Sequence, residues 1–128
     1  MDASGTSNDT GLTSNILIDS STLYAIADDD SRRLLYVRFV SNDVTVRNTL
    51  IAETDSEGYA DREGIDESPS FSNNNYFNAP GFYDTSQYIF DDSNYFNLDP
   101  GFVDPSTGDF TITNQTLIDN NIGDPRWR

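Results

Sequence analysis

The sequence contains no cysteine, no histidine and no lysine, and all seven of its basic residues are arginine. Without Cys and His, the chain cannot form a zinc finger, a thiolate nucleophile, a Ser-His-Asp triad or a His-ligated metal site. Without Lys, it has neither a Schiff-base residue nor the lysine of a P-loop. No apolar run approaches the roughly 18 residues that a membrane span needs.

The 128 residues carry 22 acidic and 7 basic side chains, which gives a net charge of −15 at pH 7. This acidity argues against binding to a nucleic-acid backbone. The aromatic content of 12% and the short, dense apolar runs favour an ordered fold over a disordered acidic chain. The length fits one domain, which we expect over residues 12–128, after a flexible Gly/Ser/Asn-rich lead-in over residues 1–11.

The apolar pattern predicts short β-strands. Asn, Asp, Ser and Thr outnumber Glu, Gln and Ala, which favours turns and strand edges over helix interiors. Residues 44–47 alternate apolar and polar, as a half-buried strand does, whereas the apolar run 34–40 predicts a strand covered on both faces. Residues 41–43 between them predict a turn, and the acidic stretch 53–70 predicts an excursion on the surface.

An internal repeat is the most informative pattern. Residues 75–84 match residues 94–104, with one residue inserted before the second proline, and weaker copies begin at Asn15 and Asn48. The repeat predicts a solenoid whose successive coils stack as parallel strands around a shared core. Its C-terminal cap is expected over residues 105–128.

Three asparagines and two glycines have predicted structural roles in this solenoid. Asn48, Asn75 and Asn94 are expected at the bends, because Asn tolerates left-handed backbone angles and stacked amides can bond each other for about 1 kcal/mol per bond. The alternative for each single Asn is an ordinary solvated turn residue. Gly81 and Gly101 follow prolines and are expected to supply the positive φ of a tight turn.

The C-terminal segment has its own signals. Residues 110–113 predict a last strand, and Asn114 is a suitable N-cap for a short helix extending to about Asn121. Gly123 and the following proline end that helix, and Trp127 is expected to pack back onto the fold.

Residues 98–102, 108–112 and 123–127 (Leu-Asp-Pro-Gly-Phe, Gly-Asp-Phe-Thr-Ile and Gly-Asp-Pro-Arg-Trp) resemble the C-terminus of a family of Bacteroidetes-type cell-surface proteins of unknown function. Members of that family carry a right-handed parallel β-helix similar to pectate lyases, and often lie beside genes for polysaccharide use. The resemblance therefore implies an all-β fold of this type, with a short C-terminal helix. It also implies an extracellular, outer-membrane-surface or periplasmic lipoprotein with upstream domains in a longer chain.

Four residues are candidates for carbohydrate binding. Tyr83 and Tyr88 are expected to offer aromatic faces to sugar rings, although packing in the core is the competing explanation. Arg38 and Arg47 are expected to grip uronate carboxylates, with charge balance for neighbouring aspartates as the alternative.

The abundant carboxylates are candidate ligands for calcium, a hard cation that takes oxygen ligands, and no other cofactor is expected. Residues 28–30 and the pair Asp91–Asp92 are acidic clusters, but solvated turns are the favoured explanation for both. Pectate-lyase-like enzymes pair such a calcium with an Arg or Lys base. No cluster in this chain aligns with theirs, so we assign no catalytic residue.

The sequence favours a non-catalytic polysaccharide-binding or structural module of a secreted or surface-anchored bacterial protein. The alternatives are a polysaccharide lyase or glycoside hydrolase acting on uronate-rich glycans, and a purely structural fragment without a ligand. The expected partners are a polysaccharide and the upstream domains. Nucleic acid and a membrane span are not expected.

Overall fold

A computed structural model describes residues 12–36, 42–61 and 69–128. Its strands are β1 (Ser14–Asp19), β2 (Thr22–Tyr24), β3 (Leu35–Tyr36), β4 (Asn42–Arg47), β5 (Leu50–Ala52), β6 (Ala60–Asp61), β7 (Ser70–Ser72) and β8 (Asn75–Phe77). Its helices are η1 (Pro80–Phe82), η2 (Pro105–Thr107), α1 (Gln115–Asp119) and η3 (Pro125–Trp127), of which only α1 is an α-helix. No helix in these ranges is long and apolar enough to cross a membrane.

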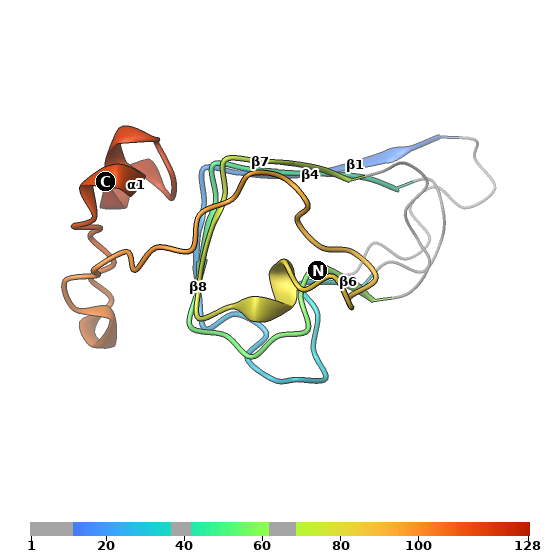
Figure 1. Cartoon of the computed structure of the whole chain (residues 1–128), viewed down its shortest axis with the longest axis horizontal. Helices are drawn as coiled ribbons and strands as arrows, with labels where there is room; N and C mark the ends of the chain where they lie inside the picture. Colours follow the sequence, from blue (N-terminus) through green and yellow to red (C-terminus); the bar gives the residue numbers. More distant parts are fainter. Residues whose placement is uncertain (1–11, 37–41, 62–68) are drawn as a thin grey trace.

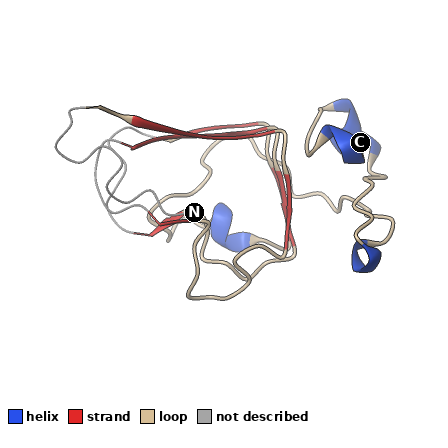
Figure 2. Ribbon diagram, turned by 180° about the vertical axis from the view of Figure 1, so that it is seen from behind, coloured by secondary structure: helices blue, strands red, loops and turns tan. Residues whose placement is uncertain are grey.

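The strands form three separate parallel sheets, in the orders β1-β4-β7, β2-β5-β8 and β3-β6. The pairing is in register, so that Ile51 lies between Leu23 and Tyr76 in the second sheet. Figures 1 and 2 show β1, β4 and β7 lying over one another along one side, with β8 and its partners along the adjoining side. The strands are therefore parallel, but they do not pair in the register of the repeat, because Asn15 lies opposite Asp43 and Asn75 lies opposite Leu50.

The expected right-handed parallel β-helix is nevertheless wrong. The described ranges contain two small three-stranded sheets and one two-stranded sheet, and no closed or solenoid sheet. The strands are two to six residues long. The second copy of the strong repeat adds no fourth strand to either three-stranded sheet. It contributes one isolated bridge, between Asn75 and Phe96.

The side chain of Asn75 explains why the stacking ends at this bridge. Asn75 is fully buried in β8. Its Nδ2 donates to the carbonyl oxygen of Leu98 (3.0 Å), and its Oδ1 accepts from the Leu98 backbone N–H (2.9 Å). The side-chain amide of Asn75 thus bonds the backbone N–H and C=O of Leu98. A continuing strand would use these two groups to pair with β8. Beyond this point the chain leaves the stacked layers, and residues 99–128 lie outside them (Figure 1).

A column of amides marks the corner between the first two sheets. Ser20, Asn48 and Asn73 follow β1, β4 and β7, and all three have left-handed backbones with φ between 47° and 54°. The Nδ2 of Asn73 donates to Asn48 Oδ1 (2.8 Å), and the Nδ2 of Asn48 donates to Asp19 Oδ1 (3.1 Å). The predicted amide stacking is therefore real for Asn48, but its partner is Asn73. Asn75 lies within a strand, and Asn94 is exposed.

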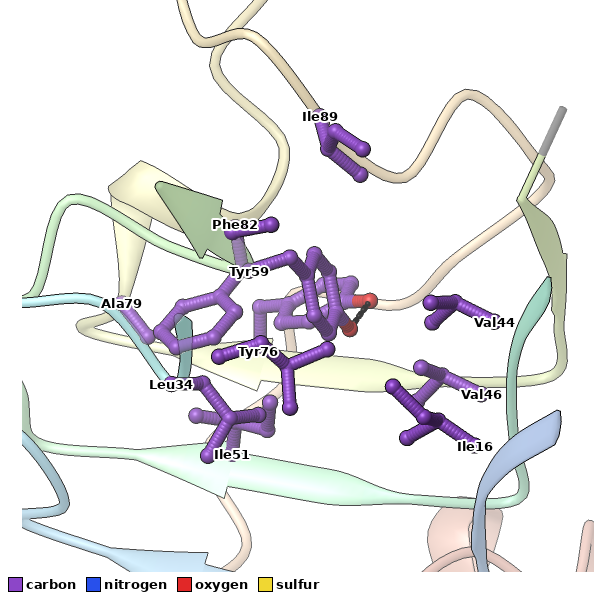
Figure 3. Close-up of a cluster of buried hydrophobic side chains, with 12 residues drawn as sticks. Ile16, Leu34, Val44, Val46, Ile51, Tyr59, Tyr76, Ala79, Phe82 and Ile89 are labelled. Carbon is purple, nitrogen blue, oxygen red and sulfur yellow. Dashed lines mark hydrogen bonds between the residues drawn. The ribbon is translucent and has the colours of Figure 1, made fainter. Parts of the chain in front are cut away.

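The main core lies between the sheets and consists of apolar residues from the inner faces of the strands, together with Tyr59, Tyr76 and Phe82 (Figure 3). β5 is buried throughout because both of its faces are covered. Ile51 points into the main core. Leu50 and Ala52 belong to a second cluster with residues of the C-terminal segment, chiefly Ile112, Leu117 and Ile122.

The predicted N-cap of the C-terminal helix is confirmed. The Oδ1 of Asn114 accepts from the backbone N–H of Thr116 (3.0 Å) at the start of α1. Trp127 packs against the second cluster, as expected, and its carbonyl oxygen accepts from the Ile112 N–H (2.7 Å). The strand predicted over residues 110–113 does not form, because its backbone pairs with the chain end and with Val103 instead of a sheet.

Two other local predictions need correction. The strand predicted over residues 34–40 is confirmed at Leu35–Tyr36, and its residues 37–40 lie outside the described ranges. β4 begins at Asn42, so the predicted turn 41–43 is strand at its last two residues. Residues 54–60 are largely buried instead of exposed. Buried polar side chains in this stretch form hydrogen bonds with backbone groups. For example, Thr54 Oγ1 donates to the Ile26 carbonyl oxygen (2.8 Å).

The two glycines of the repeat are required for different reasons. Gly101 has φ of +60°, as predicted for a turn glycine. Gly81 does not have a positive φ, and lies instead in η1 against the backbone of a neighbouring segment. A Cβ at Gly81 would lie 2.1 Å from the carbonyl oxygen of Ser56. Close backbone packing is therefore what excludes a side chain at this position.

Replacing Asn75 tests the proposed end of the ladder. Asn75→Ala removes the amide and leaves the backbone N–H and C=O of Leu98 without these partners. The free energy of unfolding should fall by about 1–3 kcal/mol. Urea denaturation measures the change. The matched control is Asn94→Ala, at the equivalent position of the repeat, which should change stability by less than about 0.5 kcal/mol because Asn94 is exposed. Equal losses for the two variants would contradict the assignment.

Candidate functional site

The two predicted carbohydrate-binding tyrosines lie in different environments. Tyr88 is 61% exposed. Tyr83 is half-buried and stacks on Tyr95, with ring centroids 5.0 Å apart, and it also packs against the main core. Much of the face that Tyr83 would offer to a sugar is therefore in contact with another ring.

Of the two predicted arginines, Arg47 alone lies within the described ranges. Arg38 lies in residues 37–41, outside the described ranges. Arg47 ends β4 and pairs with Asp19 across the first sheet, with its Nε 2.8 Å and its Nη2 2.7 Å from Asp19 Oδ2. This hydrogen bond lowers the pKa of Asp19 below its ordinary value. Charge balance is thus a role that Arg47 already has.

An acidic cleft of about 560 Å³ runs beside η1. It is lined by Asp29, Asp30, Asp55, Ser56, Glu57, Pro80, Gly81, Asp84 and Gln87. Ser31 donates its hydroxyl and backbone N–H to Asp29, and Ser86 donates its backbone N–H to Asp84, so the pKa of each of these carboxyls lies below its usual range. Within the described ranges, no group of three or more acidic residues is arranged to hold a metal ion.

A buried polar network crosses the main core. The hydroxyls of Tyr59 and Tyr76 are 2.5 Å apart (Figure 3). Tyr76 donates to Asp91 Oδ2 (2.7 Å), which also accepts from Asn74 Nδ2 (3.0 Å). The other oxygen, Oδ1, accepts from the backbone N–H and hydroxyl of Ser93 (2.8 and 2.5 Å). Asp91 is 1% exposed and is fully satisfied by these donors, so the network stabilises the core and does not present a reactive group to solvent.

An aromatic surface lies where the C-terminal segment meets β2. Tyr24, the last residue of β2, is 38% exposed. Its ring contacts Phe102 and Phe110, at centroid distances of 5.9 and 5.3 Å, and these two rings contact each other edge to face at 5.6 Å. Phe110 in turn packs edge to face on Trp127. The three mutual contacts hold the Tyr24 ring at the surface in a defined orientation. We call Tyr24, Phe102 and Phe110 the aromatic platform.

Two depressions border the aromatic platform. One, of about 370 Å³, is lined by Thr22, Leu23, Tyr24, Ile26 and Phe110. The other, of about 380 Å³, is lined by Tyr24, Glu53, Phe77, Asp99, Gly101, Phe102 and Pro105. The first is mainly apolar, whereas the second carries two carboxylates. A ring with apolar space on one side and hydrogen-bond acceptors on the other suits a ligand that has apolar faces and hydroxyl edges.

Sequence reasoning missed the aromatic platform. Tyr24 lies in a short apolar run, and Phe102 lies in the second copy of the repeat. No spacing connects them, because they meet only when the C-terminal segment packs on the second sheet. The detectable signal was the excess of aromatic residues in an acidic chain, which indicates a function for some of them without locating it.

Residues 16–127 match a protein family described as a domain of unknown function (DUF5123), so the chain belongs to that family. The match begins in β1, ends in η3 and includes all three residues of the aromatic platform. The family description assigns no activity, source or fold. No curated protein and no solved structure matches the chain.

Alkaline titration of stability tests the buried tyrosine pair. Burial raises the pKa of both Tyr59 and Tyr76 above the ordinary value of about 10. Above pH 10 the unfolded chain therefore loses protons that the folded chain keeps. The stability that these two groups contribute is present below pH 10. It falls at higher pH by about 1.4 kcal/mol per pH unit for each tyrosine.

Urea denaturation between pH 8 and pH 11 measures this slope. Tyr59→Phe should make the fall in unfolding free energy shallower by about 1.4 kcal/mol per pH unit. Tyr88→Phe, at an exposed position, should leave the slope unchanged. The same slope in Tyr59→Phe as in the original protein would contradict a raised pKa at Tyr59.

Proposed function

We propose that this DUF5123 domain is a non-catalytic module that binds a neutral polysaccharide on the aromatic platform. The observation that carries the proposal is the ring of Tyr24, which is solvent-facing yet held in place by Phe102 and Phe110, with Glu53 and Asp99 lining the adjoining depression. The apolar face of a sugar ring can pack on such an aromatic surface, and its hydroxyls can donate to carboxylates.

The charge distribution supports a neutral ligand over a uronate. The chain carries a net charge of −15, and the depression beside Tyr24 adds two carboxylates at the contact itself. Arg33, Arg47 and Arg126 pair with Glu57, Asp19 and Asp124. A polyuronate would therefore meet repulsion at the platform and would have to displace acidic partners from these arginines.

The acidic cleft is what favours the alternative, a glycoside hydrolase. Such an enzyme needs one carboxyl that stays protonated at the working pH, with a raised pKa, to act as the acid. In the cleft, hydrogen bonds from Ser31 and Ser86 lower the pKa of Asp29 and Asp84, which keeps both ionised. These carboxylates can accept hydrogen bonds from sugar hydroxyls but are poor proton donors. We therefore favour binding over hydrolysis.

The location that fits this function is outside the cytoplasm, where polysaccharides occur as nutrients or as structural material. We propose that the domain is part of a secreted or surface-anchored protein of the Bacteroidetes type, as the resemblance of its C-terminal residues implies. In that setting, other domains of a longer chain would supply any catalysis or anchoring.

Substitution of Tyr24 tests the proposal. Tyr24→Ala should weaken binding to a neutral polysaccharide by about tenfold or more, because it removes the stacking surface. Tyr24→Phe, which keeps the ring, should retain most of the affinity. Affinity electrophoresis and calorimetry against β-glucan, galactomannan, arabinoxylan and polygalacturonate measure the effect.

Tyr88→Ala is the matched control, since it removes an exposed tyrosine that lines neither depression. Loss of binding in Tyr88→Ala but not in Tyr24→Ala would move the site to the tyrosine that the sequence suggested. Binding to none of the neutral polymers would overturn the proposal. Release of reducing ends or of unsaturated products from any of the four polymers would show that the domain is an enzyme.

A further inference from the structure

We propose that the site takes an internal stretch of a linear neutral polysaccharide, which lies across the Tyr24 ring with sugar units on both sides of it. A chain end or a single sugar would not fill this site. The inference rests on the proposed function and deepens it, because it states which part of the polysaccharide is recognised and how many units make contact.

The arrangement of the two depressions carries this inference. Tyr24 lines both of them, and none of their other described lining residues is shared. Tyr24 therefore borders two separate spaces, instead of forming the floor of a single pocket. Each space is within the size range of small-molecule sites, and both are open to solvent. A monosaccharide on the ring would leave most of both spaces empty.

The strand register of the second sheet explains how Tyr24 comes to border the depression that carries the two carboxylates. Tyr24, Ala52 and Phe77 are paired in register, so they form one row across the outer face of this sheet. The middle residue of the row has only a methyl group, whereas both of its neighbours are aromatic. Tyr24 and Phe77 then line the same depression, with Phe102 and Pro105 from the C-terminal segment as further lining.

The carboxylates of this depression are held in place before any ligand arrives. Glu53 has a left-handed backbone (φ of 55°), and its Oε1 accepts from Asn78 Nδ2 (2.9 Å). Asp99 Oδ1 accepts from the backbone N–H of Gly101 (2.8 Å). Fixed acceptors beyond the ring suit the hydroxyls of a sugar unit next to the stacked one. The apolar depression, with Leu23 and Ile26, suits the less polar face of the unit on the other side.

A series of oligosaccharides of increasing length tests the inference. The probes are gluco-, manno- and xylo-oligosaccharides of one to six units, together with the parent polymers, measured by calorimetry on the full chain. Affinity should rise at least tenfold between one and four units and then level off, because about three to four units fill both depressions and cover the ring.

The stoichiometry with a long polymer gives a second readout. Binding to internal stretches predicts many protein molecules per polymer chain, whereas recognition of a chain end predicts about one. Conversion of the reducing end to an alditol should leave the affinity of the six-unit probe unchanged. In Tyr24→Ala, the gain in affinity with oligosaccharide length should largely disappear, because the Tyr24 ring connects the two depressions.

The outcomes separate the two proposals. If a neutral polymer binds but the single sugar binds equally well, or if about one protein molecule binds per polymer chain, the inference is wrong and the proposed function stands. If no neutral polymer binds, both are wrong.

Discussion

The packing of the C-terminal segment on the outer face of the second sheet is the constraint on which the rest of the structure depends. Leu50 and Ala52 point to this face and are covered by Ile112, Leu117 and Ile122. Two backbone N–H groups of the segment fix it in place, because Gly123 donates to the Asn48 carbonyl oxygen (2.8 Å) and Asp124 donates to the Thr22 side-chain Oγ1 (2.9 Å). Asn73 Nδ2 extends the amide column to the carbonyl oxygen of Asn120 (2.8 Å).

This packing also creates the candidate site. Phe102 and Phe110 come from the C-terminal segment and Tyr24 from the first layer of strands, so the platform exists only in the docked arrangement. Gly123 shows how little room the interface leaves, because a Cβ there would lie 2.9 Å from Thr22 Oγ1 and 3.0 Å from Ile112 Cδ1. Stability of the domain and integrity of the site are therefore linked through the same contacts.

Local signals in the sequence predicted local structure well. The alternation at Val44–Val46 is a strand, Asn48 is a left-handed corner, and Asn114 caps α1. Predictions that needed long-range contacts had mixed outcomes, since Trp127 packs back onto the fold as expected but the predicted solenoid is wrong. The repeat suggested continued stacking at residues 94–104, but the buried amide of Asn75 takes the backbone of Leu98 and ends it. Tyr59 lies in an acidic, polar stretch, and its burial depends on distant rings, those of Phe71, Tyr76 and Phe82. The platform combines Tyr24 with two rings that follow it by 78 and 86 positions, which no local pattern connects.

Mapping the ligand contact by NMR tests the central claim most directly. A ¹⁵N- and ¹³C-labelled chain is titrated with a neutral oligosaccharide of six units, and the shifted backbone and aromatic signals are assigned. The account predicts that the largest shifts fall on Tyr24, Glu53, Phe102 and Phe110, on both sides of the Tyr24 ring. Shifts centred on Tyr83 and Tyr88 or on the acidic cleft, with the platform unchanged, would contradict it.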